Sequence, residues 1–293
     1  MTAAAVPDSR PAPPAIRVAG GTISDDLRAI RMVWKRELIR FARNRIRIVT
    51  SLMQPVLFLF VLGSGLRGIT QGITQKGFDF RTFMFPGVLS MAVLFTAIFS
   101  AISIVWDREF GFLREMLVAP VSRSSLVIGK TLGGASVAAF QGMVMLCLAG
   151  AVHVPYDPKL FLVLILELLL VATALTAFGT MAASRMQQVE SFQVVMQFFV
   201  LPMFFLSGAV FPLSKLPTWL RTLNVIDPLT YGVDPMRRAV FSKLHVNAAT
   251  TRTLAPGVHW NGWRVPTLVE LLIVALMAAS MTAIAIWQFS RAD

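Results

Sequence analysis

The chain has 293 residues, of which 56% are hydrophobic and only 14% are charged, and its mean hydropathy is +0.69. Because a soluble domain carries about 25% charged residues, this composition excludes a soluble protein and indicates one embedded in a lipid bilayer. The net charge of +12 alone would suggest a nucleic-acid-binding protein, but the basic residues gather before the first apolar segment, where topology and anionic headgroups account for them. We therefore expect no nucleic-acid partner.

Residues 1–23 are rich in Ala and Pro and lack the apolar centre of a signal peptide, which predicts a disordered tail before a single membrane domain over residues 24–293. After a helix-start signal at residues 24–26, apolar residues recur at intervals of three and four: Leu27, Ile30, Trp34, Leu38 and Phe41. With basic residues on the other faces, this narrow stripe predicts an interfacial amphipathic helix in the headgroup plane. The alternative is a solvated helix packed on another protein.

Six runs of about 20 residues have few or no charges, and a bilayer core of about 30 Å requires helices of this length. They are residues 48–66, 82–105, 126–151, 160–183, 191–211 and 265–290. The sequence therefore predicts an all-α, polytopic membrane protein with six transmembrane helices.

The flanking basic residues predict the orientation of these spans. Eight Lys and Arg lie between residues 28 and 47, which places the N-terminus in the cytoplasm by the positive-inside rule. An even number of spans returns the C-terminus to the cytoplasm and puts residues 212–264 outside. Arg outnumbers Lys 21 to 6, which is typical of a GC-rich bacterial genome, so we expect a bacterial inner (plasma) membrane.

The segment between the second and third spans, residues 106–130, is too polar to cross the membrane. Phe110, Leu113 and Leu117 recur at helical spacing before Pro120, which predicts a short amphipathic helix on the cytoplasmic side. Charges of both signs favour docking to a protein over resting on the inner leaflet. The candidate docking residues are Asp107, Arg108, Glu109, Phe110, Leu113, Arg114, Met116 and Leu117.

Prolines divide the predicted outer segment, residues 212–264, into pieces too short to span. Two short helices there can dip into the outer interface. They can gate the outer end of a pathway, with Trp219 and Tyr231 as candidate gate residues, or anchor shallowly in the interface.

A few polar residues fall inside the predicted spans. Glu167 lies deep in the fourth span, where a carboxylate is costly in lipid, and three roles stay open: substrate contact, proton acceptor, or protonated structural hydrogen-bonding group. Gln193 and Gln197 form a polar stripe on the fifth span and join Glu167 as candidates for a substrate pathway. Lys130 and Glu270 lie near span ends, so we expect both to extend to the interface.

No catalytic, cofactor-binding or metal-binding motif is apparent in the sequence. The single cysteine, Cys147, cannot form an intramolecular disulfide, and the three histidines lack metal-ligand spacing. Residues 128–131 resemble the end of a phosphate-binding loop, but Ser124 occupies the place of its first glycine. We therefore expect no cofactor, no metal and no enzymatic activity of the chain itself.

Three segments resemble the permeases of ATP-binding-cassette type-2 exporters, particularly the daunorubicin-resistance and nodulation-factor kind. Residues 108–134, REFGFLREMLVAPVSRSSLVIGKTLGG, resemble the region around their cytoplasmic coupling helix, and residues 205–217 and 227–240 resemble later motifs. The resemblance implies an N-terminal connecting helix, re-entrant outer helices before the sixth span, and pairing of two membrane subunits with two separate ATPases. It also implies that residues 107–118 dock into the ATPase.

We therefore expect the permease subunit of an exporter for a hydrophobic or amphipathic substrate such as a drug, an antibiotic, a lipid or a glycolipid. The predicted cytoplasmic segments are too small for an ATPase domain, so the ATPase must be a separate cytoplasmic subunit. The second membrane subunit can be a copy of this chain or a related permease. The alternative is a proton-coupled secondary transporter that uses Glu167, although no internal repeat supports it. An intramembrane enzyme is disfavoured because no catalytic constellation is present.

Overall fold

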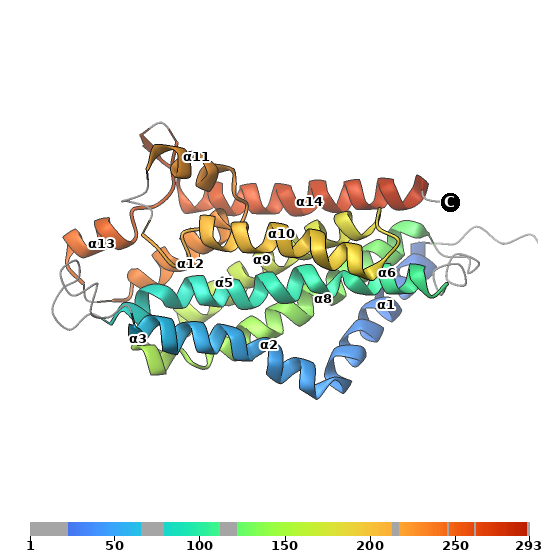
Figure 1. Ribbon diagram of the computed structural model, residues 1–293, viewed down its shortest axis with the longest axis horizontal. Coiled ribbons are helices and arrows are strands. Elements are labelled where there is room, and N and C mark those ends of the chain that lie inside the picture. The colour runs from blue at the N-terminus through green and yellow to red at the C-terminus, as the bar shows by residue number, and fades with distance from the viewer. Residues whose placement is uncertain are drawn as a thin grey trace, which may run out of the picture.

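The computed structural model describes residues 23–65, 79–111, 122–212, 217–244, 246–260 and 262–291. These residues are almost entirely helical, and the long helices run side by side in an elongated bundle (Figure 1). The predicted all-α, polytopic fold is confirmed. The predicted disordered tail lies, except for Ile23, outside the described residues.

Five helical segments of the described residues are long and apolar enough to cross a membrane. They are residues 45–65, made of α2 (Arg45–Leu57), a π-helical turn (Phe58–Leu62) and α3 (Gly63–Gly65); residues 80–109, made of α5 (Phe80–Ser100) and α6 (Ile102–Glu109); α9 (Pro158–Ala183); α10 (Val189–Leu206); and α14 (Thr267–Arg291). They coincide within a few residues with the predicted first, second, fourth, fifth and sixth spans.

The predicted third span is α8 (Arg123–Leu146), which is less apolar than these five because it is rich in small and polar residues. Its 24 residues extend about 36 Å, enough to cross a bilayer core. The small residues admit α1 closely: an added Cβ would lie 2.9 Å from Val33 Cβ at Gly129 and 2.7 Å from Glu37 Cβ at Gly133. A turn of 3-10 helix (Ala149–Val152) follows α8.

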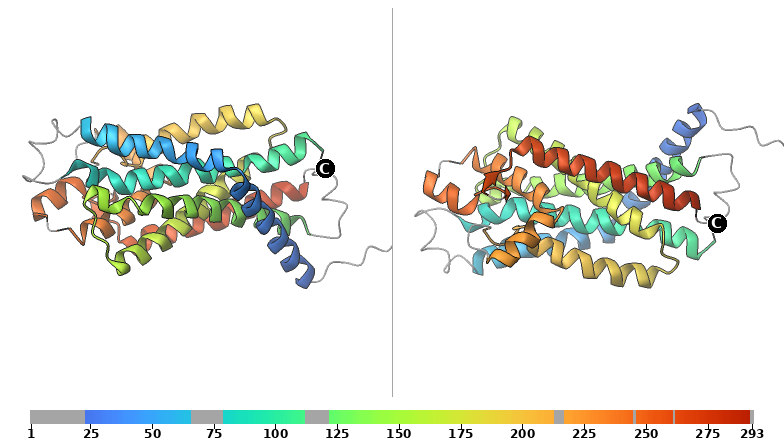
Figure 2. Two further views of the ribbon diagram at one scale, coloured as in Figure 1. Left: turned by 90° about the horizontal axis from the view of Figure 1, so that it is seen from below. Right: turned by 90° about the horizontal axis from the view of Figure 1, so that it is seen from above.

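Helix α1 (Ile23–Arg43) forms where the amphipathic pattern predicted a helix, and it crosses the end of the bundle at an angle (Figure 2). Its Trp34 belongs to the apolar stripe of the predicted interfacial helix. The indole is half-buried and donates a hydrogen bond from Nε1 to Ser136 Oγ of α8 at 3.0 Å. Leu27 remains exposed, so the predicted stripe is divided between contact with the chain itself and the surroundings.

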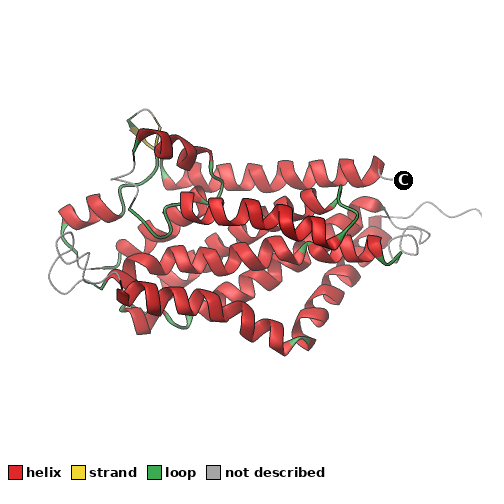
Figure 3. Ribbon diagram, viewed as in Figure 1, coloured by secondary structure: helices red, strands yellow, loops and turns green. Residues whose placement is uncertain are grey.

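Five short elements gather at the end of the bundle opposite to α1 (Figures 1 and 3). They are α11 (Thr218–Ile226), α12 (Thr230–Phe241), α13 (Ala248–Leu254), β1 (His259–Trp260) and β2 (Trp263–Arg264). We call this end the cap. The opposite end, where α6 ends, α8 begins and α14 ends, we call the base.

Helix α5 occupies the centre of the bundle, and Phe83, Phe85 and Leu89 on it are fully buried. Helices α10 and α14 lie outside, with apolar side chains such as Phe198 and Leu268 exposed by 74% and 79%. Large exposed apolar faces on long helices are the expected surface of a protein solvated by lipid.

Candidate functional site

A buried cluster of charges joins α1, α6 and α8 at the base. Asp107 Oδ2 lies 2.5 Å from Lys130 Nζ and 3.1 Å from Arg36 Nη2. The Lys130 ammonium also donates to Ser103 Oγ at 3.2 Å and lies 3.8 Å from Glu37 Oε1. The prediction that Lys130 extends to the interface is therefore wrong: its side chain is 4% exposed because these carboxylates hold it inside the bundle. Removing one member of such a cluster leaves an unpaired buried charge, which costs about 3–5 kcal/mol.

Arg108 and Glu109, the last two residues of α6, contact the part of the base where α9 ends and α10 begins. Arg108 donates from Nη1 to the carbonyl oxygen of Met186, between α9 and α10, at 2.8 Å. Glu109 Oε2 accepts a hydrogen bond from the backbone N–H of Val189, the first residue of α10, at 2.9 Å. Three consecutive side chains at the end of α6 thus contact different neighbours.

Ser122, which directly precedes α8, also contacts α1. Asp26 Oδ1 accepts hydrogen bonds from the Ser122 backbone N–H at 3.2 Å and from Ser125 Oγ at 2.9 Å. The side chains of Ser122 and Ser125, together with the Ser122 N–H, lower the pKa of Asp26 because their hydrogen bonds stabilise its ionised form. Residues 112–121, which we call the connection, are therefore bounded on both sides by residues bonded to α1.

The end of α14 is also fixed at the base. Arg123 donates from Nη1 to the carbonyl oxygens of Phe289 and Ser290 at 3.3 and 3.0 Å. These carbonyls lie in the last turn of α14, where a cation is favourable. Arg108 lies over the Phe289 ring at 6.0 Å from its centroid.

Of the predicted docking residues, only the first four fall in the described part of the chain. Asp107, Arg108 and Glu109 make the internal contacts above, whereas Phe110 is 69% exposed. The other four, Leu113, Arg114, Met116 and Leu117, lie outside the described residues. Sequence reasoning placed the segment but missed Arg36, Glu37 and Asp26, because no local spacing links them to it.

The three predicted pathway residues do not form one site within the chain. Glu167 is buried in α9, and its Oε2 has no hydrogen-bond partner among the described residues. Gln193 and Gln197 are exposed on the outward face of α10, where they line a shallow hollow with Val194, Phe198, Leu201 and Pro202.

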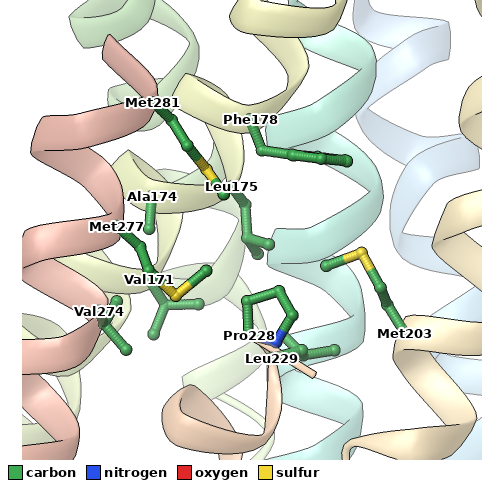
Figure 4. Close-up of a pocket in the computed structure, with 10 residues that line it drawn as sticks. All are labelled: Val171, Ala174, Leu175, Phe178, Met203, Pro228, Leu229, Val274, Met277 and Met281. Atoms are coloured by element: carbon green, nitrogen blue, oxygen red, sulfur yellow. The ribbon is translucent and has the colours of Figure 1, made fainter. Parts of the chain in front are cut away.

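An apolar pocket lies between α9, α10, α14 and the start of α12 (Figure 4). Leu175 and Phe178 of α9 form one wall, Met277 and Met281 of α14 another, and Met203 of α10 faces them. All ten lining residues are apolar, so the pocket suits only apolar groups. This pocket was difficult to predict from the sequence, because methionines at this spacing are common in hydrophobic cores.

The two predicted gate residues are placed differently in the cap. Trp219 is 66% exposed. Tyr231 is buried, donates to the carbonyl oxygen of Val225 at 2.7 Å and accepts a hydrogen bond from Trp260 Nε1 at 3.0 Å. Tyr231 therefore holds α12 to α11 and to the strand β1.

A second charge cluster joins the cap to α14. Arg238 Nη2 lies 2.6 Å from Asp234 Oδ2 and 3.1 Å from Glu270 Oε1. The prediction that Glu270 extends to the interface is wrong, because its side chain is fully buried against this guanidinium. Asp234 and Arg238 were not predicted, although opposite charges four residues apart on a helix are a readable signal.

This fold and these contacts define a class: a polytopic helical membrane protein whose spans are tied together at the base and covered by short helices at the cap. A family model described as ABC-2 type transporter matches residues 28–241. The match covers most of the chain, which therefore belongs to the ABC-2 type transporter family.

Curated relatives of the chain include transport permeases. The inner membrane transport permease YadH of Escherichia coli is 24% identical over 224 residues, 76% of this chain and 87% of YadH. Nodulation protein J of Sinorhizobium fredii is 25% identical over 233 residues, 76% of this chain and 88% of that protein. The probable multidrug ABC transporter permease YbhR of Escherichia coli is 27% identical over 158 residues, 53% of this chain and 43% of YbhR. The chain is thus the membrane subunit of an ABC transporter.

Proposed function

We propose that this permease exports a hydrophobic or amphipathic substrate, driven by ATP hydrolysis on a separate cytoplasmic ABC ATPase subunit. The observation that carries the proposal is the double attachment of the connection. Arg36 of α1 pairs with Asp107 just before it, and Asp26 of α1 bonds Ser122 just after it. A partner that pushes on the connection would therefore move α1, α6 and α8.

The contacts at the base define which elements would move. Displacement of the end of α6 pulls on α1 and α8 through Asp107, on the turn after α9 through Arg108, and on α10 through Glu109. Closely packed helices move as rigid bodies because their interfaces resist continuous deformation. ATP-driven closure of the ATPases would thus shift α10 and α8 relative to the central α5.

A second membrane subunit, either another copy or a related permease, would complete the pathway. Gln193 and Gln197 face outward from α10, and amide side chains are poorly solvated by acyl chains. We propose that this face meets the second subunit and lines the substrate path. Phe198 and Val194, exposed by 74% and 71% on the same face, supply apolar contact for the partner or the substrate.

The proposed orientation puts the base, the N-terminus and the C-terminus in the cytoplasm of a bacterial cell and the cap outside its inner membrane. The eight basic residues before the first span support it. A hydrophobic or amphipathic cargo agrees with the mixed lining of the hollow on α10, where two glutamines lie among apolar side chains. YbhR is named a probable multidrug permease, which suits the same substrate class.

The test uses Phe110, which is exposed next to the connection and makes none of the structural contacts of Asp107, Arg108 or Glu109. Phe110→Asp should reduce co-purification with the cognate ATPase and ATP-dependent uptake of substrate into inverted vesicles by about tenfold, as for an apolar interface anchor. Phe110→Leu, the matched control, should keep both. Normal co-purification and export by Phe110→Asp would overturn the proposed docking role.

A second candidate function, proton-coupled transport, rests on Glu167. Its carboxyl group is buried in a membrane span with one oxygen unpartnered among the described residues, as expected of a proton relay. Transport in vesicles free of ATPase, abolished by Glu167→Gln, would favour this function. Export that requires the ATPase and survives Glu167→Gln would exclude it.

A further inference from the structure

The short hairpin of the cap has two chemically different faces. His259 pairs with Arg264 across the strands, and Trp260 pairs with Trp263. Because successive strand residues point to opposite faces, the imidazole and guanidinium share one face and the two indoles share the other. The Trp260 and Trp263 ring centroids lie 6.1 Å apart, and Trp260 is bonded to Tyr231 of α12. The hairpin therefore contacts α12 through its aromatic face.

The basic face of the hairpin borders an open hollow. Arg264 and His259 line it from the hairpin, and Arg252 lines it from the last turn of α13. No carboxylate of the described residues lies within 4.0 Å of the guanidinium of Arg252 or Arg264, and Arg264 interacts with the buried Glu270 carboxylate only at longer range. None of the seven residues that line the hollow is acidic.

Backbone geometry brings these donors together. Gly257 has a φ of +86°, and an added Cβ there would lie 3.0 Å from Arg264 Nε, so the absence of a side chain lets this guanidinium lie against the backbone. His259 Nδ1 lies 3.0 Å from the carbonyl oxygen of Gly257, which orients the imidazole ring. The neighbouring Arg238 is already paired with Asp234 and Glu270, so it is not a free donor for this hollow.

This arrangement suits an anion. The Arg252 and Arg264 guanidinium groups line one hollow, and like charges repel each other unless an anion lies between them. The planar guanidinium fork matches the oxygens of a phosphate group and binds them bidentately. The tryptophans of the hairpin suit the membrane interface, which is the depth of lipid headgroups.

We propose that the hollow formed by Arg252, His259 and Arg264 binds a phosphate group of net negative charge, presented by an anionic phospholipid at the cap. Free inorganic phosphate offers the same oxygens, so the test separates the two sources. This site is independent of the proposed transport function. Its ligand would hold α13 against the hairpin that leads into α14.

The test uses the full-length chain purified in detergent. Native mass spectrometry measures the binding of dioleoylphosphatidylglycerol, with zwitterionic dioleoylphosphatidylcholine as the comparison lipid. Thermal unfolding with added inorganic phosphate, against chloride at equal ionic strength, measures binding of the free anion. The variant Arg252→Gln/Arg264→Gln is compared with Arg43→Gln/Arg221→Gln, which removes two exposed positive charges elsewhere.

The proposal predicts that Arg252→Gln/Arg264→Gln weakens phosphatidylglycerol binding about tenfold, which corresponds to the loss of about 1.4 kcal/mol. The control pair should stay near wild type, and phosphatidylcholine binding should be equal in all three proteins. Stabilisation of the wild type alone by inorganic phosphate would assign the site to phosphate from either source, whereas no stabilisation would assign it to the lipid headgroup.

Equal phosphatidylglycerol binding by the two double variants would overturn the proposal, because binding would then depend on overall charge or on another surface. Should Arg252→Gln/Arg264→Gln elute as an aggregate, Arg252→Lys/Arg264→Lys takes its place. That pair keeps the charge but lacks the guanidinium fork, so its phosphatidylglycerol binding should be several-fold weaker than that of the wild type. Unchanged binding by the lysine pair would contradict the assigned geometry.

Discussion

The base and the cap each bury a cluster of charges, but the two clusters differ in how completely their carboxylates are hydrogen-bonded. At the base, the Lys130 ammonium and the Arg36 guanidinium surround Asp107, and Glu37 adds a second carboxylate. In the cap, the Arg238 guanidinium is shared by Asp234 and Glu270, and Arg237 and Arg264 add positive charge near these two carboxylates. Both oxygens of Asp234 and Oε2 of Glu270 nevertheless lack a hydrogen-bond partner among the described residues. The base joins elements distant in sequence through direct pairs, whereas the cap leaves carboxylate oxygens without hydrogen bonds. The base should therefore act as a rigid unit and the cap as an adjustable one.

The largest effect is expected from Lys130→Met at the base. This change leaves the buried Asp107 carboxylate with only the half-exposed Arg36, and it should destabilise the protein by about 3–5 kcal/mol. Thermal unfolding in one detergent measures the loss. Lys159→Met on the exposed start of α9 is the matched control and should be near neutral. Asp107→Asn combined with Lys130→Met should recover part of the loss, and a Lys130→Met variant as stable as the control would refute the buried pairing.

The same carboxylate-to-amide change should distinguish the two clusters. Asp107→Asn should cost about 2 kcal/mol, less than Lys130→Met, because the Lys130 ammonium keeps Glu37 Oε1 at 3.8 Å and Ser103 Oγ at 3.2 Å. Glu270→Gln leaves Arg238 paired with Asp234 and keeps an amide oxygen that can accept its hydrogen bond, so it should cost less than Asp107→Asn, about 1 kcal/mol or less. Unfolding midpoints of both variants check the comparison, and an equal loss in both would show that the cap is as tightly paired as the base.

The structure also explains which of these features the sequence could predict. Long apolar runs predicted the spans because length and apolarity are local properties, and the pairing of Asp234 with Arg238 was readable because the residues lie four apart on α12. Lys130 and Asp107 are 23 residues apart on different helices, and Trp34 and Ser136 are 102 apart. Such pairs depend on how α1, α6 and α8 pack. The sequence therefore predicted that Lys130 extends to the interface, whereas the fold buries it.

The pH dependence of stability should have opposite signs at the two ends. Burial raises the pKa of Asp227, in the cap, from 3.8 to about 7, so the folded state holds this proton more tightly than the unfolded state. The stability that protonated Asp227 contributes to the folded state is fully present below about pH 4 and is lost as the pH rises towards about 7. At the base, the lowered pKa of Asp26 gives a contribution present above its unfolded pKa of about 3.8 and lost as the pH falls through the lower folded value.

Unfolding midpoints measured from pH 4 to pH 8 for the wild type, Asp227→Asn and Asp26→Asn test these signs. Asp227→Asn should remove the loss of stability between about pH 4 and 7. Asp26→Asn should leave that loss intact and lower stability slightly at neutral pH. Parallel pH profiles for the wild type and Asp227→Asn would contradict the raised pKa of Asp227.

A smaller effect than that of the base cluster is expected at the contact of α1 with α8. Trp34→Phe removes the hydrogen bond to Ser136 and should cost about 1 kcal/mol or less. Trp219→Phe, at an exposed position of the cap, should be neutral. A double-mutant cycle with Ser136→Ala measures the coupling between the two residues, and zero coupling would show that this hydrogen bond does not hold α1 in place.

Labelling of single cysteines in intact cells determines whether the base faces the cytoplasm and the cap faces outward. In a Cys147→Ser background, Phe110→Cys and Arg221→Cys place one exposed thiol at the base and one in the cap. A membrane-impermeant maleimide should label the Arg221→Cys protein in intact cells and the Phe110→Cys protein only after permeabilisation. Labelling of the Phe110→Cys protein in intact cells would contradict this orientation.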